Sequence, residues 1–354
     1  MDTLTHALSG ALLARAGAPP RSVRSPLTGH EWMLTGFCAA AFPDADYLYY
    51  LVDRLEYLNV HQGSTHSLLL WPLWSAALGL ALALLFGKPR CWRWFTAAAA
   101  LGVAAHIGGD LLTAFGVQAF APLSSARFSL RTTFVIDPYF SALVIAGLAV
   151  SRTRWGRAGA VGALGLLAAY VAAQSLLQQR ALEVARSHAA TEGLENARVY
   201  ALAQPFHPFN WKLLVGGPRR YDEAYLNLAT RAPSPFVFPA DSTLGRMARA
   251  YRPAHDLRWR EHRRLADHNP AHPDVRAAWR QPALAGFRRF ARFPVLHRVA
   301  EARGERCLWF TDLRYTLPEL RPPFRYGACR HGPGALWRAY RLRFFTDDAR
   351  QPLQ

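Results

Sequence analysis

Residues 94–115 read WFTAAAALGVAAHIGGDLLTAF, an apolar stretch of membrane-helix length that contains two titratable side chains, His106 and Asp110. A bilayer core about 30 Å thick needs roughly 20 apolar residues in one helix. His106 and Asp110 are four residues apart, so a helix places both on one face, about one turn apart. Titratable side chains inside a membrane are costly and usually mark functional interiors. The stretch therefore predicts a membrane helix that contributes to a polar site.

Other segments of the N-terminal half share this apolar character. Residues 31–52, 66–87 and 158–178 are long enough to span a bilayer, 134–151 is shorter, and 2–17 is short and contains polar residues. Short polar spans require shielding by neighbouring helices, so we expect 2–17 to pack inside the bundle. Together with 94–115, these segments predict about five to six transmembrane helices.

The second half of the chain has a different pattern. Apolar and polar residues alternate in several segments, which is typical of antiparallel strands. The predicted strands lie near 198–204, 209–216, 221–229, 293–300, 305–313 and 335–345, and the Pro- and Arg-rich stretch 231–282 predicts loops with one or two helices. The expected fold is an α-helical membrane bundle over 1–178, followed by a mainly antiparallel β (α+β) soluble domain over 179–354.

Basic residues between the predicted spans indicate an orientation. They are Arg21 and Arg24, then Lys88, Arg90 and Arg93, then Arg152, Arg154 and Arg157. The positive-inside rule makes these three connections cytoplasmic. The loops 53–65 and 116–133 and the C-terminal domain then face outward, as expected for a bacterial inner-membrane protein with a periplasmic or otherwise extracytoplasmic domain. Cys307 and Cys329 could form a disulfide in that compartment, although two unpaired thiols fit the sequence equally well.

The formal net charge of +18 does not predict a nucleic-acid partner. Lysine occurs only at Lys88 and Lys212, so the basicity comes almost entirely from arginine, in a chain rich in Ala, Gly and Pro. This skew is typical of a GC-rich genome, and the arginines are scattered instead of forming a stripe or recognition helix. An Arg-rich domain beside a bilayer is instead attracted to anionic headgroups, so membrane lipids are the expected partners.

Eight histidine and aspartate residues recur in the apolar half. They are His6, Asp44 and Asp46 in FPDAD (42–46), His61 and His66 in HQGSTH (61–66), His106, Asp110, and Asp137 in IDP (136–138). Pro43 predicts a helix break that could turn Asp44 and Asp46 toward one site. A lone buried histidine is usually a satisfied core group, and an aspartate before a proline is equally well a helix cap. Eight such residues in an apolar half nevertheless favour a metal site, because histidine and carboxylate are the ligand set of zinc, manganese or iron.

Four of these motifs together resemble a known family. MDTLTH at 1–6, FPDAD, HQGSTHS and AHIGGDLLTAFG are similar to the bacterial inner-membrane proteins described as membrane-bound metal-dependent hydrolases, which include the YdjM- and YbcI-like proteins. The resemblance covers about residues 1–140, and more loosely a following domain that begins at QPFHPFNW (204–211). It implies an integral membrane hydrolase with a divalent metal, zinc first among the candidates. Its implied ligands are His6, Asp44, Asp46, His61, His66, His106 and Asp110.

The expected chemistry is hydrolysis by metal-activated water. One or two divalent ions would lower the pKa of water toward neutrality, and a carboxylate that is not fully used as a ligand, Asp46 or Asp137, would act as general base. A site in the outer half of the membrane admits amphiphiles, so a phospholipid or other lipid-linked phosphoester is the expected substrate. Two alternatives remain: a metal or proton transporter, because intramembrane His and Asp also line ion paths, and a membrane anchor that presents a binding domain.

Overall fold

The computed structural model describes residues 1–20, 22–194, 196–229, 238–239, 241–265, 273–302 and 304–353. Arg21, one of the predicted cytoplasmic charges, and parts of the predicted loop region 231–282 lie outside the described residues. The chain forms two compact units. One comprises Met1–Asp53 and Val60–Leu176 and the other comprises Arg54–Asn59 and Leu177–Gln354. We call them the helical unit and the sheet unit.

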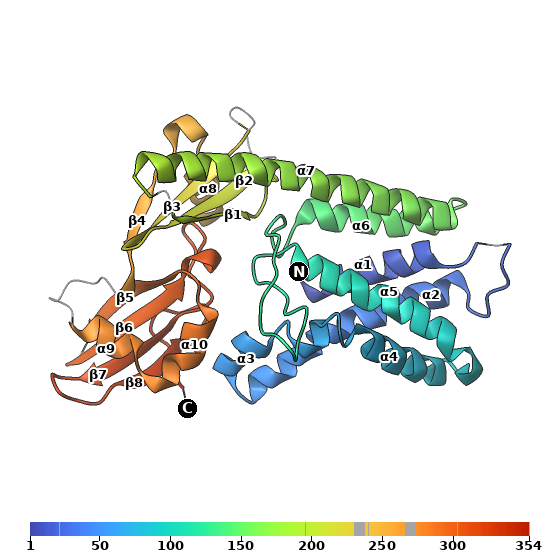
Figure 1. Cartoon of the computed structure of the whole chain (residues 1–354), viewed down its shortest axis with the longest axis horizontal. Coiled ribbons are helices and arrows are strands. Elements are labelled where there is room, and N and C mark those ends of the chain that lie inside the picture. Colours follow the sequence, from blue (N-terminus) through green and yellow to red (C-terminus); the bar gives the residue numbers. More distant parts are fainter. Residues whose placement is uncertain are drawn as a thin grey trace. The chain divides into compact units, whose positions relative to one another are not determined.

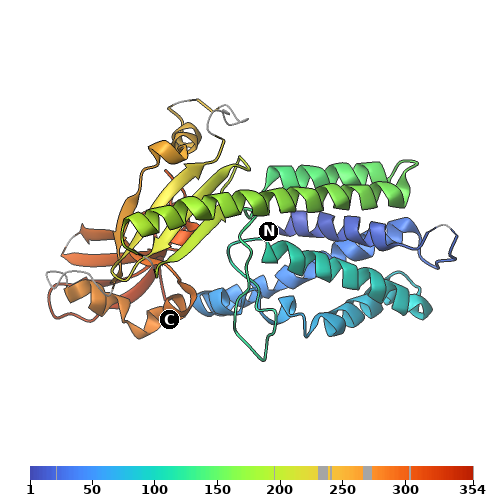
Figure 2. The ribbon, with the colours of Figure 1, turned by 45° about the horizontal axis from the view of Figure 1, so that its top comes forward.

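The helical unit is built from α1 (Thr3–Gly17), α2 (Gly29–Ala41), α4 (Trp71–Leu85), α5 (Trp92–Leu111), α6 (Pro138–Ser151) and the first part of α7 (Gly156–Thr191). Short 3-10 helices η1 (Phe42–Leu51), η2 (Ser64–His66) and η3 (Pro89–Cys91) connect them. Helix α5 packs against α1, α2 and α4, and α6 packs on α1. Figures 1 and 2 show these helices running alongside one another.

Glycines set the spacing of the three central helices. A Cβ at Gly10 of α1 would lie 2.3 Å from the Ala40 Cβ and 2.4 Å from the Gly36 carbonyl oxygen of α2, and a Cβ at Gly102 of α5 would lie 2.5 Å from that same Gly36 oxygen. Small residues at such crossings let helix backbones approach closely, as in membrane bundles. The close approach brings the polar residues of α1, the α2–η1 junction and α5 together.

The prediction of five to six membrane spans is wrong, because too few helices are both long enough and apolar enough to cross a membrane. Among the described residues, α7 alone qualifies as a membrane-crossing helix, or two spans qualify if the pair Arg54–His66 and Trp71–Leu85, bent by 74°, counts as one. The predicted span 31–52 changes at Pro43 from α2 into the 3-10 helix η1, and 66–87 contains only the 15-residue α4. Helices α1 and α6 have 15 and 14 residues, short of the roughly 20 that a bilayer requires.

The sheet unit contains two antiparallel sheets, as the alternating pattern predicts. The first has the order β1 (Arg198–Ala203), β2 (Asn210–Gly216), β3 (Arg220–Asn227), β4 (Arg260–Arg263), and the second β5 (Pro294–Ala302), β6 (Glu305–Asp312), β7 (Tyr326–His331), β8 (Arg338–Leu342), β9 (Arg350–Pro352). Helices α3 (Arg54–Val60), α8 (Thr243–Ala250), α9 (Pro273–Trp279) and α10 (Ala285–Phe290) and the short η4 (Ala254–Asp256), η6 (Pro282–Leu284) and η7 (Leu313–Tyr315) complete the chain. A helical N-terminal region followed by antiparallel sheets is therefore confirmed.

The two sheets are anchored differently. The last part of α7 places Ala181, Ala185 and Ala189 against Trp211 and Leu213 of β2, which gives the first sheet an apolar core. In the second sheet, Cys307 of β6 lies opposite Cys329 of β7, and the two form a disulfide. Of the two states that the sequence leaves open for these cysteines, the structure contains the bonded one.

Candidate metal centre

Helix α5 supplies two residues of the site from one face. His106 and Asp110 are both buried, and the Nε2 atom of His106 lies 3.3 Å from the Oδ2 atom of Asp110. The spacing of four residues makes this contact possible, since such residues are neighbours on a helix surface. The predicted helical face is therefore present, with both side chains turned away from solvent.

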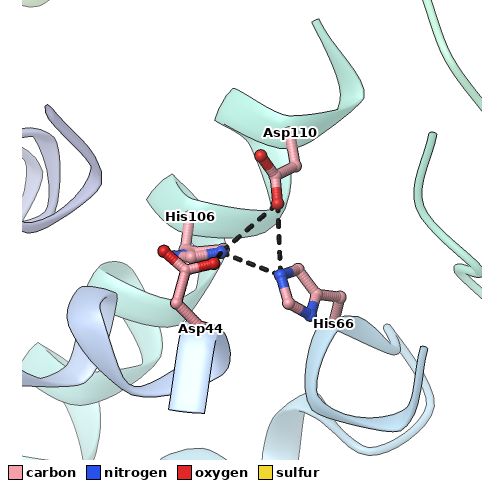
Figure 3. Close-up of side chains that lie close together, drawn as sticks. All are labelled: Asp44, His66, His106 and Asp110. Carbon is pink, nitrogen blue, oxygen red and sulfur yellow. Dashed lines mark hydrogen bonds and ion pairs between the residues drawn. The ribbon is translucent and has the colours of Figure 1, made fainter. Parts of the chain in front are cut away.

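The HQGSTH segment supplies the third residue. His66, at the end of η2, is fully buried, and its Nε2 atom lies 2.9 Å from His106 Nε2 and 3.1 Å from Asp110 Oδ2 (Figure 3). Two backbone features make the turn possible. Gln62 adopts a positive φ of 58°, and a Cβ at Gly63 would lie 2.5 Å from the Val60 carbonyl oxygen. The close backbone approach at Gly63 brings His66 to the face of α5.

Asp44 completes the group from the first turn of η1. Its Oδ1 atom lies 3.6 Å from His106 Nε2, and its Oδ2 atom accepts a hydrogen bond of 2.5 Å from the Thr3 hydroxyl. Asp44, His66, His106 and Asp110 each offer one ligand atom, and these four atoms all lie within 4.8 Å of one another. We call these four residues the metal cluster; Figure 3 shows their polar atoms pointing toward one another.

The Nδ1 atoms of His66 and His106 donate hydrogen bonds, so the Nε2 atom of each neutral ring carries a lone pair. His106 Nδ1 lies 2.6 Å from the Ala40 carbonyl oxygen, which can only accept, so Nδ1 carries the proton. The Thr65 hydroxyl donates to Asp46 Oδ2 at 3.3 Å, so its oxygen accepts from His66 Nδ1 at 2.9 Å. In this arrangement two ring lone pairs face each other across 2.9 Å.

A cation between these atoms resolves the conflict. Asp110 Oδ2 is buried and has no hydrogen-bond partner among the described residues, although it lies beside both Nε2 atoms. A single proton could link the two rings, whereas a divalent cation would accept both nitrogen lone pairs and the carboxylate oxygen at once. Two histidines with carboxylates are a common donor set for zinc, manganese and iron. The residues present therefore fit a divalent metal ion.

The predicted ligand His6 lies next to the metal cluster instead of within it. Its Nε2 atom contacts Asp110 Oδ1 at 3.0 Å, on the oxygen that does not face the two histidines, and its ring stacks on that of His106 with centroids 3.8 Å apart. Gly109 makes room for it, because a Cβ there would lie 3.0 Å from His6 Cε1. The backbone nitrogen of Met1 contacts the same oxygen of Asp110. His6 thus orients Asp110, and its own Nδ1 is buried with no partner within the described residues.

Asp46 and His61, also predicted as ligands, form a pair behind His66. His61 Nδ1 lies 2.8 Å from Asp46 Oδ1, while Asp46 Oδ2 accepts from the Gln62 backbone at 3.1 Å and lies 3.7 Å from His66 Nδ1. The Thr65 hydroxyl links Asp46 to His66 Nδ1, and a carboxylate behind a ligating histidine fixes the ring and raises its basicity. Because η1 is a 3-10 helix with three residues per turn, residues two apart point in different directions. Asp44 therefore reaches the metal cluster and Asp46 does not.

Asp137, the other predicted base, lies outside the metal cluster. It is the N-cap of α6, where Oδ1 accepts from the backbone of Tyr139 and Phe140 at 2.9 and 3.0 Å. Its Oδ2 accepts from the Tyr170 hydroxyl at 2.8 Å. The structure thus places Asp137 in the cap that the sequence left as an alternative, while the supporting roles of Thr3, Thr65 and the Ala40 carbonyl had no signal in a pattern of histidines and aspartates.

Comparison with known proteins matches the same part of the chain. A family described as YdjM inner membrane protein matches residues 1–181, which include every residue of the metal cluster. A Bacillus subtilis (strain 168) protein described as "Uncharacterized protein YfhP" is 28% identical over 166 residues, which cover 46% of this chain and 48% of that protein. The chain therefore matches about half the length of this relative. No solved structure matches the chain.

Proposed function

The chain belongs to the YdjM inner membrane protein family, and we propose that it is a membrane-embedded, metal-dependent hydrolase of lipid or lipid-linked phosphoesters. The observation that carries the proposal is the approach of His66 Nε2 and His106 Nε2 to 2.9 Å beside a buried, unpartnered oxygen of Asp110. Buried polar atoms of folded proteins nearly always have a hydrogen-bond partner, and a bound ion would supply the one that this oxygen lacks.

The surface of the helical unit supports a membrane location. Only 11% of the most apolar window of α7 is buried, although that window has a mean hydropathy of 1.8. Large apolar side chains elsewhere in this unit are also exposed, among them Leu51 at 76% and Leu85 at 79%. Exposed apolar surface of this extent is unfavourable in water and favourable in lipid.

Each residue of the site has a proposed task. His66, His106, Asp110 and Asp44 would hold the metal ion, which would supply a polarising charge that activates water and draws electron density from a phosphoryl oxygen. His6 holds Asp110, and the Ala40 carbonyl and the Thr65 hydroxyl hold the rings of His106 and His66. The Asp46–His61 pair, at 10% and 17% side-chain exposure, lies closer to solvent than His66. We assign it the removal of a proton from the attacking water.

The proposed substrate class follows from the surroundings of the site. A site in a lipid-exposed helical unit is reached most readily by an amphiphile whose ester lies at the membrane surface. The disulfide between Cys307 and Cys329 favours an oxidising compartment for the sheet unit. We therefore place the reaction at the outer face of the inner membrane, with lipids as the partners and zinc as the first metal to test.

Metal content tests this proposal first. Detergent-purified wild-type protein is compared by mass spectrometry with a His106→Ala/Asp110→Ala variant and with a His30→Ala control, whose histidine is exposed and outside the metal cluster. We expect near-stoichiometric zinc, manganese or iron in the wild type and in the control, and loss of this metal from the double variant. Folded wild-type protein that takes up no divalent ion would overturn the proposal.

Turnover separates an enzyme from the transporter and anchor alternatives. The metal-loaded protein is assayed against phospholipid and polyprenyl phosphoesters, with Asp110→Ala as the inactive control. Phosphate release by wild type alone supports hydrolysis. Metal binding without turnover, together with metal uptake into proteoliposomes, would support transport instead.

A further inference from the structure

The sheet unit contains a cavity of about 840 Å³ that is lined from both sheets. One wall comes from β3, β4 and the segment before β4, and the other from β5, the end of β6 and residues 313–322. This volume lies within the usual range for small-molecule sites, about 300–1,000 Å³. All of the lining residues belong to the sheet unit, so the cavity is separate from the metal cluster.

The cavity wall carries an excess of positive charge. Five arginines line it, namely Arg246, Arg249, Arg252, Arg258 and Arg260, against two glutamates, Glu223 and Glu319. Glu319 is already paired with Arg246 at 3.2 Å. Arg258 and Arg260 form no ion pair within the described part of the chain. We call this space the arginine cavity.

The buried glutamate at the cavity does not offset this charge, because its own partners neutralise it. Glu223 contacts Lys212 Nζ at 3.2 Å and His262 Nε2 at 3.0 Å, and it accepts from the Tyr225 and Thr316 hydroxyls at 2.9 Å each. Burial would raise the pKa of Glu223, but the adjacent Lys212 and His262 lower it below its ordinary value. Arg246 pairs with Glu319 and Arg252 pairs with Asp256, so the excess positive charge at the cavity comes from Arg258 and Arg260.

Strand geometry directs these arginines into the cavity. Side chains two residues apart on a strand share a face, and Arg260 and His262 of β4 both line the cavity. Arg258, just before the strand, lines it as well. Arg260 lies directly opposite Glu223 in the β3–β4 register. Arg263 follows on the other face of β4, where it lies opposite Arg220.

We propose that the arginine cavity binds the phosphate or pyrophosphate group of an organic ligand. Guanidinium groups match phosphate oxygens in charge and in paired hydrogen-bond geometry. The lining also includes Trp259 on the first wall and Leu296, Leu317 and Leu320 on the second, which suit an apolar body attached to the phosphate. Trp259 is held in place by stacking on His188 with ring centroids 3.7 Å apart. The ligand is thus an amphiphilic phosphoester, supplied either as a lipid headgroup or as a soluble molecule.

Calorimetric titration of the full-length, EDTA-treated protein in an uncharged detergent tests the assignment. The probes are inorganic pyrophosphate and water-soluble dihexanoyl phosphatidic acid. We expect Arg258→Ala/Arg260→Ala to weaken binding at least tenfold, the size of effect that loss of a charge-assisted hydrogen bond produces. Arg263→Ala, on the other face of the same strand, should stay within about twofold of wild type.

The two probes separate the sources of the ligand. Tighter binding of phosphatidic acid than pyrophosphate assigns a lipid headgroup, and equal or weaker binding assigns a soluble phosphate. Asp110→Ala should bind both probes like wild type, because EDTA removes metal-bound anions and the metal cluster lies in the other unit. The proposal is overturned if wild type binds neither probe, or if Arg263→Ala loses as much affinity as the double variant.

Discussion

The metal cluster of the helical unit and the Lys212–Glu223 network of the sheet unit are both buried groups of titratable side chains, yet they are satisfied in opposite ways. In the sheet unit, Lys212 Nζ donates to the Leu313 carbonyl at 2.6 Å and to the Thr316 hydroxyl at 2.6 Å, and Glu223 accepts from every side. In the metal cluster, two acceptor nitrogens face each other and an aspartate oxygen has no donor. A buried network in which every acceptor has a donor is stable without a ligand and indicates a structural role. A buried group in which acceptors face one another is stable only with a bound cation or proton, and indicates a binding site.

This comparison predicts the largest effect for removal of one partner from the satisfied network. In Lys212→Met, Glu223 would remain buried with its main compensating charge gone, so we expect a loss of about 3–5 kcal/mol in the free energy of unfolding. Guanidinium unfolding of the full-length protein measures it. Lys212→Met/Glu223→Gln should recover more than half of the loss. A single variant as stable as wild type would mean that the network is not structural.

The Lys212–Glu223 network makes the stability of the fold depend on pH. Because the folded-state pKa of Glu223 lies below its ordinary value of 4.5, the network stabilises the fold above that value and stops doing so as the pH falls below it. The Lys212→Met variant lacks one of the two groups that lower this pKa and keeps the other, His262. Its unfolding midpoint should therefore change less than that of wild type between pH 6 and pH 3, roughly the range over which glutamate titrates.

Chelation is expected to have the next largest effect, and it acts on the other network. If the free metal concentration is about 100 times the Kd of the metal cluster, bound metal stabilises the fold by about 2.7 kcal/mol. EDTA should lower the thermal unfolding midpoint of wild type, and zinc or manganese should restore it. The His106→Ala/Asp110→Ala variant should respond to neither treatment. An equal response in both proteins would place the metal elsewhere.

The sequence identified the residues of the site, but it did not separate those that form the metal cluster from those that support it. The i,i+4 spacing of His106 and Asp110 fixed their common face, and the HQGSTH turn indicated His66. The spacing of FPDAD puts Asp44 and Asp46 on different sides of a helix, but it does not tell which of them faces α5, because that depends on how η1 packs. The position of His6 depends on Gly109 in a distant segment, and such long-range packing leaves no local pattern.

The same difference between local and long-range information explains the fold. The mixture of aromatic, aliphatic and polar residues along 198–204 and 305–313 sufficed to predict β1 and β6, although the last six residues of β6 are all buried. Pro43 indicated the break in 31–52. The hydropathy of 66–87 did not reveal that α4 begins only at Trp71, because a hydropathy average does not distinguish a turn from a helix. Strand β7 was missed because its short sequence, YGACRH, shows no alternation of apolar and polar residues.

A smaller effect is expected where a residue supports the metal cluster without contacting the ion. Asp46→Asn keeps the shape of the side chain but removes the charge behind His66 and His61. Loss of such a supporting group typically weakens metal affinity by about 10–100-fold. Competition against a fluorescent chelator measures the affinity, with Asp44→Asn as the comparison that removes a ligand itself. If Asp46→Asn weakens binding more than Asp44→Asn does, the two aspartates have the reverse roles.

The smallest effect is predicted for Asp137, which lies in the helical unit but resembles the satisfied network of the sheet unit. Both of its oxygens already accept hydrogen bonds, from the α6 backbone and from Tyr170. Asp137→Ala should therefore cost about 0.5–2 kcal/mol of unfolding free energy as a lost N-cap, with metal affinity unchanged. Equilibrium unfolding and the chelator competition measure the two quantities on one sample. A variant that keeps its stability and its metal but loses turnover would instead make Asp137 the general base, and a satisfied carboxylate would then no longer be evidence of a purely structural role.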